Sequence, residues 1–188
     1  DWIQERAKTA GPPGRAIRFE MAARAFAESQ LRNRMPLDGG AGCPIVVEGK
    51  KDEAALRALG FEGPIELINR GWDRSRLVAY FYDTYGTRNT IDGGPPLMLL
   101  MDWDRTGGRI QTSLRDRLNS LDVPVDENLR KVLLRAMKPE GKTVEALAPH
   151  AKILKSMIED QFDRSIIIAD EKAMSQKNSP FRSVDSLV

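Results

Sequence analysis

The sequence contains a single cysteine and a single histidine among its 188 residues. One cysteine excludes a disulfide within the chain, and one histidine beside it argues against a zinc site built from protein ligands alone. A reducing, cytoplasmic setting is therefore expected. The sequence also lacks any apolar run of the roughly 20 residues that a membrane-spanning helix requires, and no signal peptide is apparent.

The sequence has little excess of either charge. Twenty-nine basic and 27 acidic residues leave a formal net charge of +2, with a pI near 8.7. This mild balance permits nucleic-acid binding without demonstrating it, because strong polynucleotide binding usually comes with clustered positive charge. Hydrophobic residues make up 41% of the chain and charged residues 30%. This composition predicts a soluble protein with one core and appendages.

Two aliphatic runs that end in acids are the most informative features of the sequence. Ile45–Val47 precedes Glu48, and residues 97–101 precede Asp102 and Asp104. Short apolar runs followed by helical patterning are typical of buried parallel strands. Because the C-terminal ends of such strands form the ligand crevice of an open α/β sheet, the three acids are expected to gather at one edge.

Three neighbouring carboxylates repel one another unless a cation neutralises them. Oxygen ligands of this kind suit Mg²⁺ or Mn²⁺. Asp102 and Asp104, two positions apart in an extended segment, lie on the same side of the chain and can share one ion. The sequence therefore predicts a metal and phosphate site; the alternative is a set of exposed strand-end acids with no ion.

The central region, residues 43–125, alternates strand and helix patterns. Such alternation predicts an α/β fold with a mainly parallel sheet, right-handed crossovers and flanking helices. Gly60 suits the left-handed position just after a helix. The expected strands are 44–47, 65–68, 97–101 and 123–125, and the expected helices include 51–59, 77–82 and a segment marked by Ile110, Leu114, Leu118 and Leu121.

The sequence of residues 1–42 predicts a helical extension followed by a flexible link over 37–42. Apolar residues from Phe19 to Ala27 recur at helical spacing, so the helix should dock on the core. Its arginines form either a solvated basic face or an arm that binds phosphate or dimerises. These arginines are Arg15, Arg18, Arg24, Arg32 and Arg34.

Residues 126–188 predict a second helical extension with a flexible tail. Asp126 and Thr143 are candidate helix caps, and 153–162 carry an amphipathic face. Residues 166–168, three isoleucines in a row, are expected either as an edge strand or as a plug in the core. After Lys172 the chain turns polar and should be mobile.

The order of three motifs resembles a known domain. Glu48-Gly49-Lys50-Lys51-Asp52 closes the first strand, Asn69-Arg70-Gly71 the second, and Asp102-Trp103-Asp104-Arg105-Thr106-Gly107 the third. This order is similar to the Toprim domain of topoisomerases, bacterial-type primases, overcoming-lysogeny nucleases, recombination mediators and the ribonuclease that matures 5S ribosomal RNA. The resemblance covers about residues 44–125. Residues 125–147 further look like the small, stand-alone Toprim proteins of archaea.

The resemblance implies a Toprim-like, Rossmann-like fold and a role for each matching residue. Glu48 matches a glutamate that acts as general acid/base or as an additional metal ligand, and Asp102 and Asp104 match the metal-binding pair. Glycine at 49 and 107 leaves room where backbone would approach a phosphate. Side chains expected to contact phosphate or nucleic acid are Lys50, Lys51, Asn69, Arg70 and Arg105.

Trp103 departs from the Toprim pattern, since many members have a small or rigid residue between the two aspartates. It either packs in the core or offers a stacking face to a base.

Other chemical signals in the sequence favour structural roles. Gly141-Lys142-Thr143 resembles the end of a phosphate-binding loop, but Ala136 stands where the first glycine is needed, so a turn and helix cap are expected. His150 is expected to be structural or exposed, and Cys43 a small core or linker residue. The tyrosines at 80, 82 and 85 should pack or lie on the surface, because the large domain that holds the topoisomerase nucleophile is missing.

The leading functional hypothesis is a Mg²⁺- or Mn²⁺-dependent nuclease acting on RNA or DNA. One alternative is a non-catalytic module that binds nucleic acid or a ribonucleoprotein partner through its helical extensions. Another is an enzyme of small phosphate compounds such as nucleotides. No membrane partner is expected.

Overall fold

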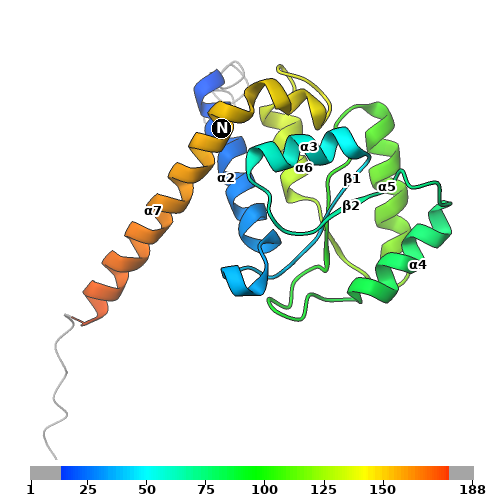
Figure 1. Ribbon diagram of the computed structural model, residues 1–188, viewed down its shortest axis with the longest axis horizontal. Helices are drawn as coiled ribbons and strands as arrows, with labels where there is room; N and C mark the ends of the chain where they lie inside the picture. Colours follow the sequence, from blue (N-terminus) through cyan, green and yellow to red (C-terminus); the bar gives the residue numbers. More distant parts are fainter. Residues whose placement is uncertain (1–13, 178–188) are drawn as a thin grey trace, which may run out of the picture.

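A parallel sheet of four strands lies at the centre of the computed structural model, which describes residues 14–177 (Figure 1). The strands are β1 (Ile45–Val47), β2 (Ile65–Leu67), β3 (Leu97–Leu99) and β4 (Val125–Asp126), in the spatial order β2-β1-β3-β4. All three neighbouring pairs are parallel. The predicted α/β fold with a parallel sheet and flanking helices is confirmed.

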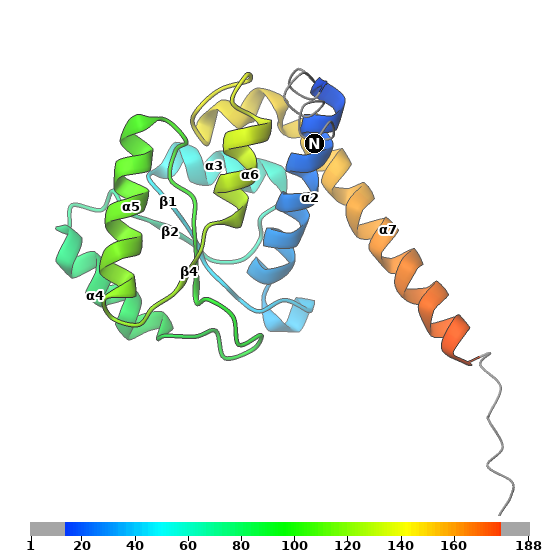
Figure 2. The same ribbon diagram turned by 180° about the vertical axis from the view of Figure 1, so that it is seen from behind.

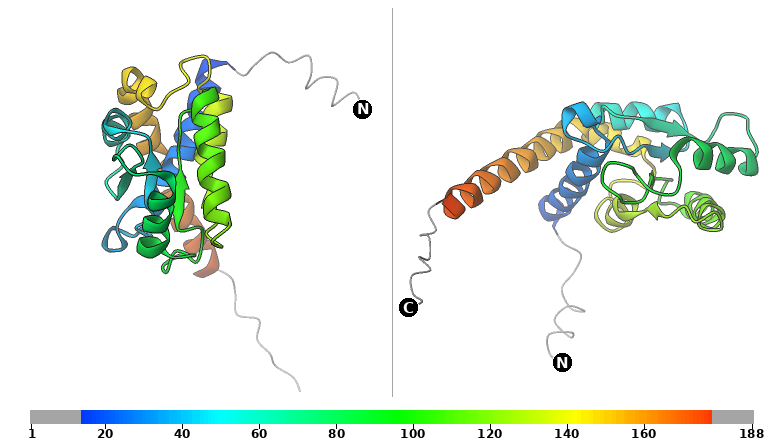
Figure 3. Two further views of the ribbon diagram at one scale, coloured as in Figure 1. Left: turned by 90° about the vertical axis from the view of Figure 1, so that its right-hand side faces the viewer. Right: turned by 90° about the horizontal axis from the view of Figure 1, so that it is seen from below.

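Helices cover both faces of the sheet because each strand alternates its side chains between the two faces. Val46 packs with Leu77 and Leu114 on one face, while Val47 packs with Phe26 and Leu56 on the other. Figure 2 shows α5 and α6 from behind, and Figure 3 shows the layers edge-on. The helices are α2 (Arg15–Asn33), α3 (Lys50–Leu59), α4 (Arg74–Tyr85), α5 (Arg105–Asn119), α6 (Asn128–Ala136) and α7 (Ala151–Lys177), with 3-10 turns η1 (Pro36–Asp38) and η2 (Glu145–His150).

The two ends of α3, the helix that follows β1, are set by a capping hydrogen bond and by a glycine. Asp52 accepts a hydrogen bond from the backbone N–H of Gly49 at 3.0 Å and so closes the start of α3. Gly60 ends that helix in the left-handed conformation, at φ 104°, as predicted. These caps fix where the strand-end residues lie relative to the helices.

The N-terminal helix α2 packs in the core, and its arginines divide between structural positions and the exposed positions of Arg15 and Arg24. Phe26 is fully buried in the same cluster as β1 and α6. Arg18 is 8% exposed and donates to the carbonyl of Ala136 at 2.8 Å. Arg32 donates to Asp92 at 2.6 Å. The prediction of a helix docked on the core is confirmed, but these two arginines are structural.

Residues 37–42, expected as a flexible link, have a defined turn structure. The segment forms η1 and a series of turns, because the backbone N–H groups of Gly40 and Gly42 bond to the carbonyls of Met35 and Arg34. The segment therefore holds the start of β1 firmly against the end of α2.

The C-terminal expectations also need correction. Residues 166–168 lie in α7 and are neither strand nor core; Ile166 is 60% exposed. The helix continues past Lys172 to Lys177, and the end of the expected mobile tail lies outside the described residues. Asp126 lies in β4, one residue before the N-cap Glu127, but its Oδ1 accepts from the N–H of Asn128, the first residue of α6, at 2.9 Å, as a capping side chain does. Thr143 accepts from the N–H of Ala146 at 3.2 Å, in agreement with the predicted cap.

Candidate functional site

The acids predicted from the strand ends lie close together at the C-terminal edge of the sheet. Glu48 follows β1, and Asp102 follows β3, its neighbour in the sheet. The Oε1 atom of Glu48 accepts a hydrogen bond from the backbone N–H of Asp102 at 3.2 Å. Parallel pairing of β1 with β3 therefore brings residues 54 positions apart into direct contact.

The two aspartates are held by different backbone groups. Asp104 Oδ1 accepts from the N–H of Gly107 at 2.7 Å and caps α5. Asp102 Oδ1 accepts from the N–H of Val144 at 2.8 Å. A Cβ atom on Gly107 would lie 2.0 Å from the carbonyl oxygen of Asp102, so glycine is required for the helix to start this close to the acids.

Burial, together with the charges of neighbouring acids, raises the pKa of Glu48 and the pKa of Asp102. Burial raises the pKa of Asp102 to about 6, and the negative charges of Glu48, Asp52 and Asp104 add to that effect. Burial also raises the pKa of Glu48, with further contributions from Asp52 and Asp104. The ionised carboxylates are thus destabilised by partial desolvation and by mutual repulsion.

Two residues of this site were missed in the sequence. Asp52 is 7% exposed, and its burial raises its pKa. Arg130, on α6, donates through Nε to the carbonyl of Met101 at 3.2 Å and through Nη2 to that of Asp102 at 3.0 Å. Burial lowers the pKa of Arg130, and the surrounding carboxylates oppose that shift. The guanidinium therefore supplies positive charge next to the acids.

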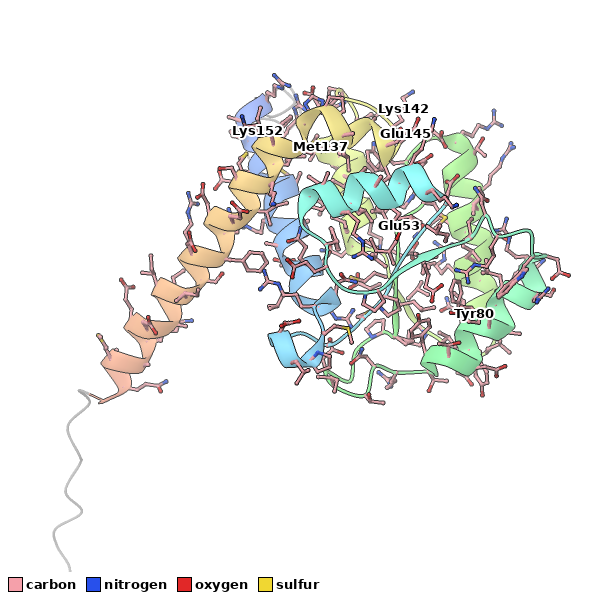
Figure 4. The ribbon with its side chains drawn as sticks, in the orientation of Figure 1. Glu53, Tyr80, Met137, Lys142, Glu145 and Lys152 are labelled. Carbon is pink, nitrogen blue, oxygen red and sulfur yellow. The ribbon has the colours of Figure 1, made fainter. Side chains whose placement is uncertain are left out.

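The basic side chains expected to contact phosphate are placed differently from one another. Lys50 and Arg105 are exposed at the first turns of α3 and α5. Lys51 is 86% exposed at its side chain and lies 4.0 Å from Glu145. Figure 4 shows Lys142, in the loop before η2, and Glu145, at the start of η2, above α3. Asn69 lies beside Gly49, since a Cβ on that glycine would be 3.9 Å from Asn69 Nδ2.

Arg70 is not brought to the acids. It donates to Glu66 Oε2 at 2.5 Å and stacks over the ring of Trp72. Tyr80 and Tyr85 also donate to Glu66, so these tyrosines have structural roles. Burial alone would raise the pKa of Glu66, but the hydrogen bonds from its partners outweigh burial and lower it.

The other residues with reactive or stacking side chains, Trp103, His150 and Cys43, have structural roles. Trp103 is 4% exposed, and its Nε1 donates to the carbonyl of Gly141 at 2.7 Å, so it offers no free stacking face. His150 packs edge-on against Phe19. Cys43 is fully buried, and burial raises the pKa of its thiol to about 12.

The carboxylates do not converge on a single point. Within residues 14–177, no group of three His, Cys, Asp or Glu side chains is arranged to hold a metal ion. Asp102 and Asp104 each direct one oxygen to a backbone N–H, as described above. In the same part of the chain, no helix is both long enough and apolar enough to cross a membrane.

Together these features define a class: an α/β protein with a four-stranded parallel sheet, whose acids meet at the C-terminal strand ends. The chain is 34% identical over 107 residues to a UPF0292 protein of Thermococcus onnurineus, covering 55% of this chain and 69% of that protein. It is 32% identical over 104 residues to one of Pyrococcus horikoshii, covering 55% and 70%. The chain belongs to the UPF0292 family.

More distant likenesses extend over similar lengths. A UPF0292 protein of Methanosarcina acetivorans is 28% identical over 125 residues, which are 65% of this chain and 78% of that protein. A solved structure of an Aquifex aeolicus protein aligns with a TM-score of 0.44 and 22% identity, over 64% of this chain and 93% of that one. No family model matches the chain.

Proposed function

We propose that this protein is a Mg²⁺-dependent enzyme that cleaves phosphodiester bonds of RNA or DNA, on a Toprim-like version of the α/β fold. The observation that carries the proposal is the contact of Glu48 with the backbone of Asp102, beside Asp104 at the start of α5. A carboxylate cluster at the C-terminal edge of a parallel sheet, next to a helix N-terminus, favours a cation together with a phosphate.

The chemistry of the donor set suits a hard divalent cation, and the three carboxylates would have to turn toward one another to share it. All of the groups are carboxylates, and burial, with the charges of neighbouring acids, raises the pKa of Glu48 and of Asp102, so a bound cation would stabilise their ionised forms. Glu48, Asp102 and Asp104 would hold the ion through the oxygens that do not bond to backbone. When bound, Mg²⁺ or Mn²⁺ would supply charge stabilisation at the phosphoryl and leaving oxygens.

The side chains have separate tasks in the proposed reaction. Glu48 moves a proton, because a carboxyl group whose pKa is raised toward neutrality is a better general acid or base. Lys50, Lys51 and Arg105, which are exposed near the acids, bind phosphate oxygens. Asn69 lines the adjacent strand end. Arg130 fixes the backbone of Asp102 and so orients the metal-binding pair.

The decisive experiment compares cleavage of labelled single- and double-stranded RNA and DNA by the wild type and Asp104→Asn, with Mg²⁺ or Mn²⁺. Asparagine can still cap α5 but removes the negative charge. Asp73→Asn is the matched control, since Asp73 caps α4 in the same way, with a 2.8 Å bond to the N–H of Arg76. Metal-dependent cleavage that only Asp104→Asn abolishes supports the proposal.

A non-catalytic nucleic-acid or ribonucleoprotein module is the second candidate. It is favoured by the structural use of both aspartates, each of which binds a backbone N–H group. Nucleic-acid binding that is equal in the wild type and Asp104→Asn, with no cleavage by either protein, would replace the nuclease proposal with this one.

A further inference from the structure

Helix α2 carries a stripe of exposed side chains on the face opposite the core. The α2 stripe consists of Ile17, Met21, Arg24, Glu28 and Leu31, spaced alternately four and three residues apart. Ile17 is 57% exposed, Met21 39% and Leu31 49%. Alternating steps of four and three place side chains in a line along one side of a helix, as in the seam of a coiled coil.

Helix α7 carries a second stripe with the same spacing. The α7 stripe consists of Ile153, Met157, Asp160, Arg164 and Ile167. Ile153 is 55% exposed and Ile167 57%. Helix α7 continues to Lys177, and Ile166, Ile168 and Met174 are further apolar side chains on its surface. A lone helix of this kind gains little stability in water without apolar cover.

When the two helices run in the same direction, each residue of the α2 stripe can face one residue of the α7 stripe; each such pair is called a step. Ile17 meets Ile153, Met21 meets Met157, and Leu31 meets Ile167, so these three steps are apolar. At the two polar steps the charges are opposite, because Arg24 would face Asp160 and Glu28 would face Arg164. A shift by one step would place charges against apolar side chains, so polar seam residues of this kind select one register.

Within one chain the two helices already lie at matching levels. Both begin at the same end of the molecule and run side by side before diverging (Figures 1 and 2). Residues from Arg24 to Arg34 on α2 and from Gln161 to Ala169 on α7 line one hollow of about 530 Å³. The second halves of the two stripes therefore lie in the same part of the molecule.

A two-fold axis along the mean direction of α2 and α7 leaves the level of every residue along that axis unchanged. It would bring the α2 stripe of one copy to the α7 stripe of the other in the matching register, and the reverse contact would form at the same time. Such an interface is closed and self-complementary, as most homodimer interfaces are.

We propose that the chain forms a two-fold homodimer in which the α2 stripe packs against the partner's α7 stripe. Arg24 pairs with the partner's Asp160, and Glu28 pairs with the partner's Arg164, which within one chain contacts Glu20 at 3.3 Å and would exchange that exposed partner for Glu28. The apolar positions bury Ile17, Met21 and Leu31. The four helices then form a parallel bundle on the side of the molecule away from the sheet.

The test is a charge-exchange series on the full 188-residue chain, measured by sedimentation velocity over a range of protein concentrations. Wild type is expected to be a dimer. Arg24→Glu and Asp160→Arg should each weaken dimerisation at least tenfold, because each creates two like-charge contacts per dimer. The double variant Arg24→Glu/Asp160→Arg restores opposite charges and should return to within about threefold of the wild type.

Glu159→Arg is the matched control, since it reverses an exposed charge on α7 next to the stripe but outside it. Its dimerisation should equal that of the wild type. A wild-type monomer at every concentration overturns the proposal. So does unchanged dimerisation of either single variant, or a double variant as weak as both singles, because the first shows that this face is not used and the second that the pairing is different. The sedimented mass does not depend on nuclease activity.

Discussion

The Nη2 atom of Arg130 donates to the carbonyl oxygen of Asp102 at 3.0 Å, so an arginine from α6 supports the backbone of residues 101–104, which we call the acidic loop. Its Nε bonds the preceding carbonyl, that of Met101. These bonds place a cation behind Asp102 and Asp104, whose carboxylates each also accept a hydrogen bond from a backbone N–H group.

Replacing Arg130 should therefore destabilise the fold. Arg130→Gln leaves two carbonyls without their charged donor and is expected to cost about 2 kcal/mol of unfolding free energy. Urea denaturation measures this change. Arg109→Gln, an exposed position on α5, is the control and should stay within about 0.5 kcal/mol of wild type. Equal stability of the two variants would show that the Arg130 bonds contribute nothing.

Glycine at 107 should be indispensable for stability, while glycine at 108 should not. A Cβ at 107 would lie 2.0 Å from the carbonyl oxygen of Asp102, whereas one at 108 would lie 3.5 Å from an Arg130 nitrogen. Gly107→Ala is expected to destabilise by about 3 kcal/mol or more. Gly108→Ala is expected to be neutral or to stabilise by up to about 1 kcal/mol, since alanine is the better helix former. Thermal unfolding of both variants checks the contrast, which similar melting temperatures would refute.

The acids should make the metal-free protein less stable as the pH rises. Because the pKa of Asp102 is raised to about 6, the folded state binds more protons than the unfolded state between pH 4 and pH 6. Stability from this group is full below about pH 4 and is lost as the pH rises through about 6. After allowance for solvent screening the loss is roughly 1 kcal/mol.

Asp102→Asn isolates this effect, since the amide oxygen can still accept the N–H of Val144. Denaturation in the presence of a chelator, at a series of pH values, should show the variant gaining stability relative to wild type between pH 4 and pH 7. A constant difference across that range would mean that Asp102 has an ordinary pKa.

Divalent cations should stabilise the wild type. An ion that binds only the folded state adds about 2.7 kcal/mol at a hundred times its dissociation constant. Chelator-treated protein is expected to melt at a higher temperature with Mg²⁺ or Mn²⁺, and Asp102→Asn should lose most of that gain. Asp73→Asn, which leaves the acidic cluster intact, should retain it. If Asp102→Asn responds to the ion as wild type does, the ion binds elsewhere.

The sequence was sufficient to predict the sheet and the meeting of the acids, for a physical reason. Buried parallel strands are continuous apolar runs, and their C-terminal ends lie at one edge, so Glu48 and Asp102 could be placed together from the chain order alone. Gly60 and Thr143 were recognisable because turn and cap chemistry is local.

Long-range partners could not be predicted in the same way. Arg130 looks like an ordinary surface residue of an amphipathic helix, and its role depends on where α6 packs. Asp52 looks like a helix-capping residue, which it also is. Arg70 was predicted at the acids, but it binds Glu66, four residues before it. The sequence does not show to which face of the sheet the side chain of Glu66 points. The isoleucines at 166–168 suggested a strand, but the helical segment before them continues through.

The bonds that Gly141, Lys142 and Val144 make to Trp103 and Asp102 have a consequence for the order of assembly. The acidic loop is complete only after a segment about forty residues downstream has folded over it. On the ribosome, the sheet can therefore form while the acids are still loosely held. Their final arrangement must wait until the chain beyond α6 has emerged. A chain truncated after β4 would therefore have the sheet but not the hydrogen bonds that residues 141–144 make to Asp102 and Trp103.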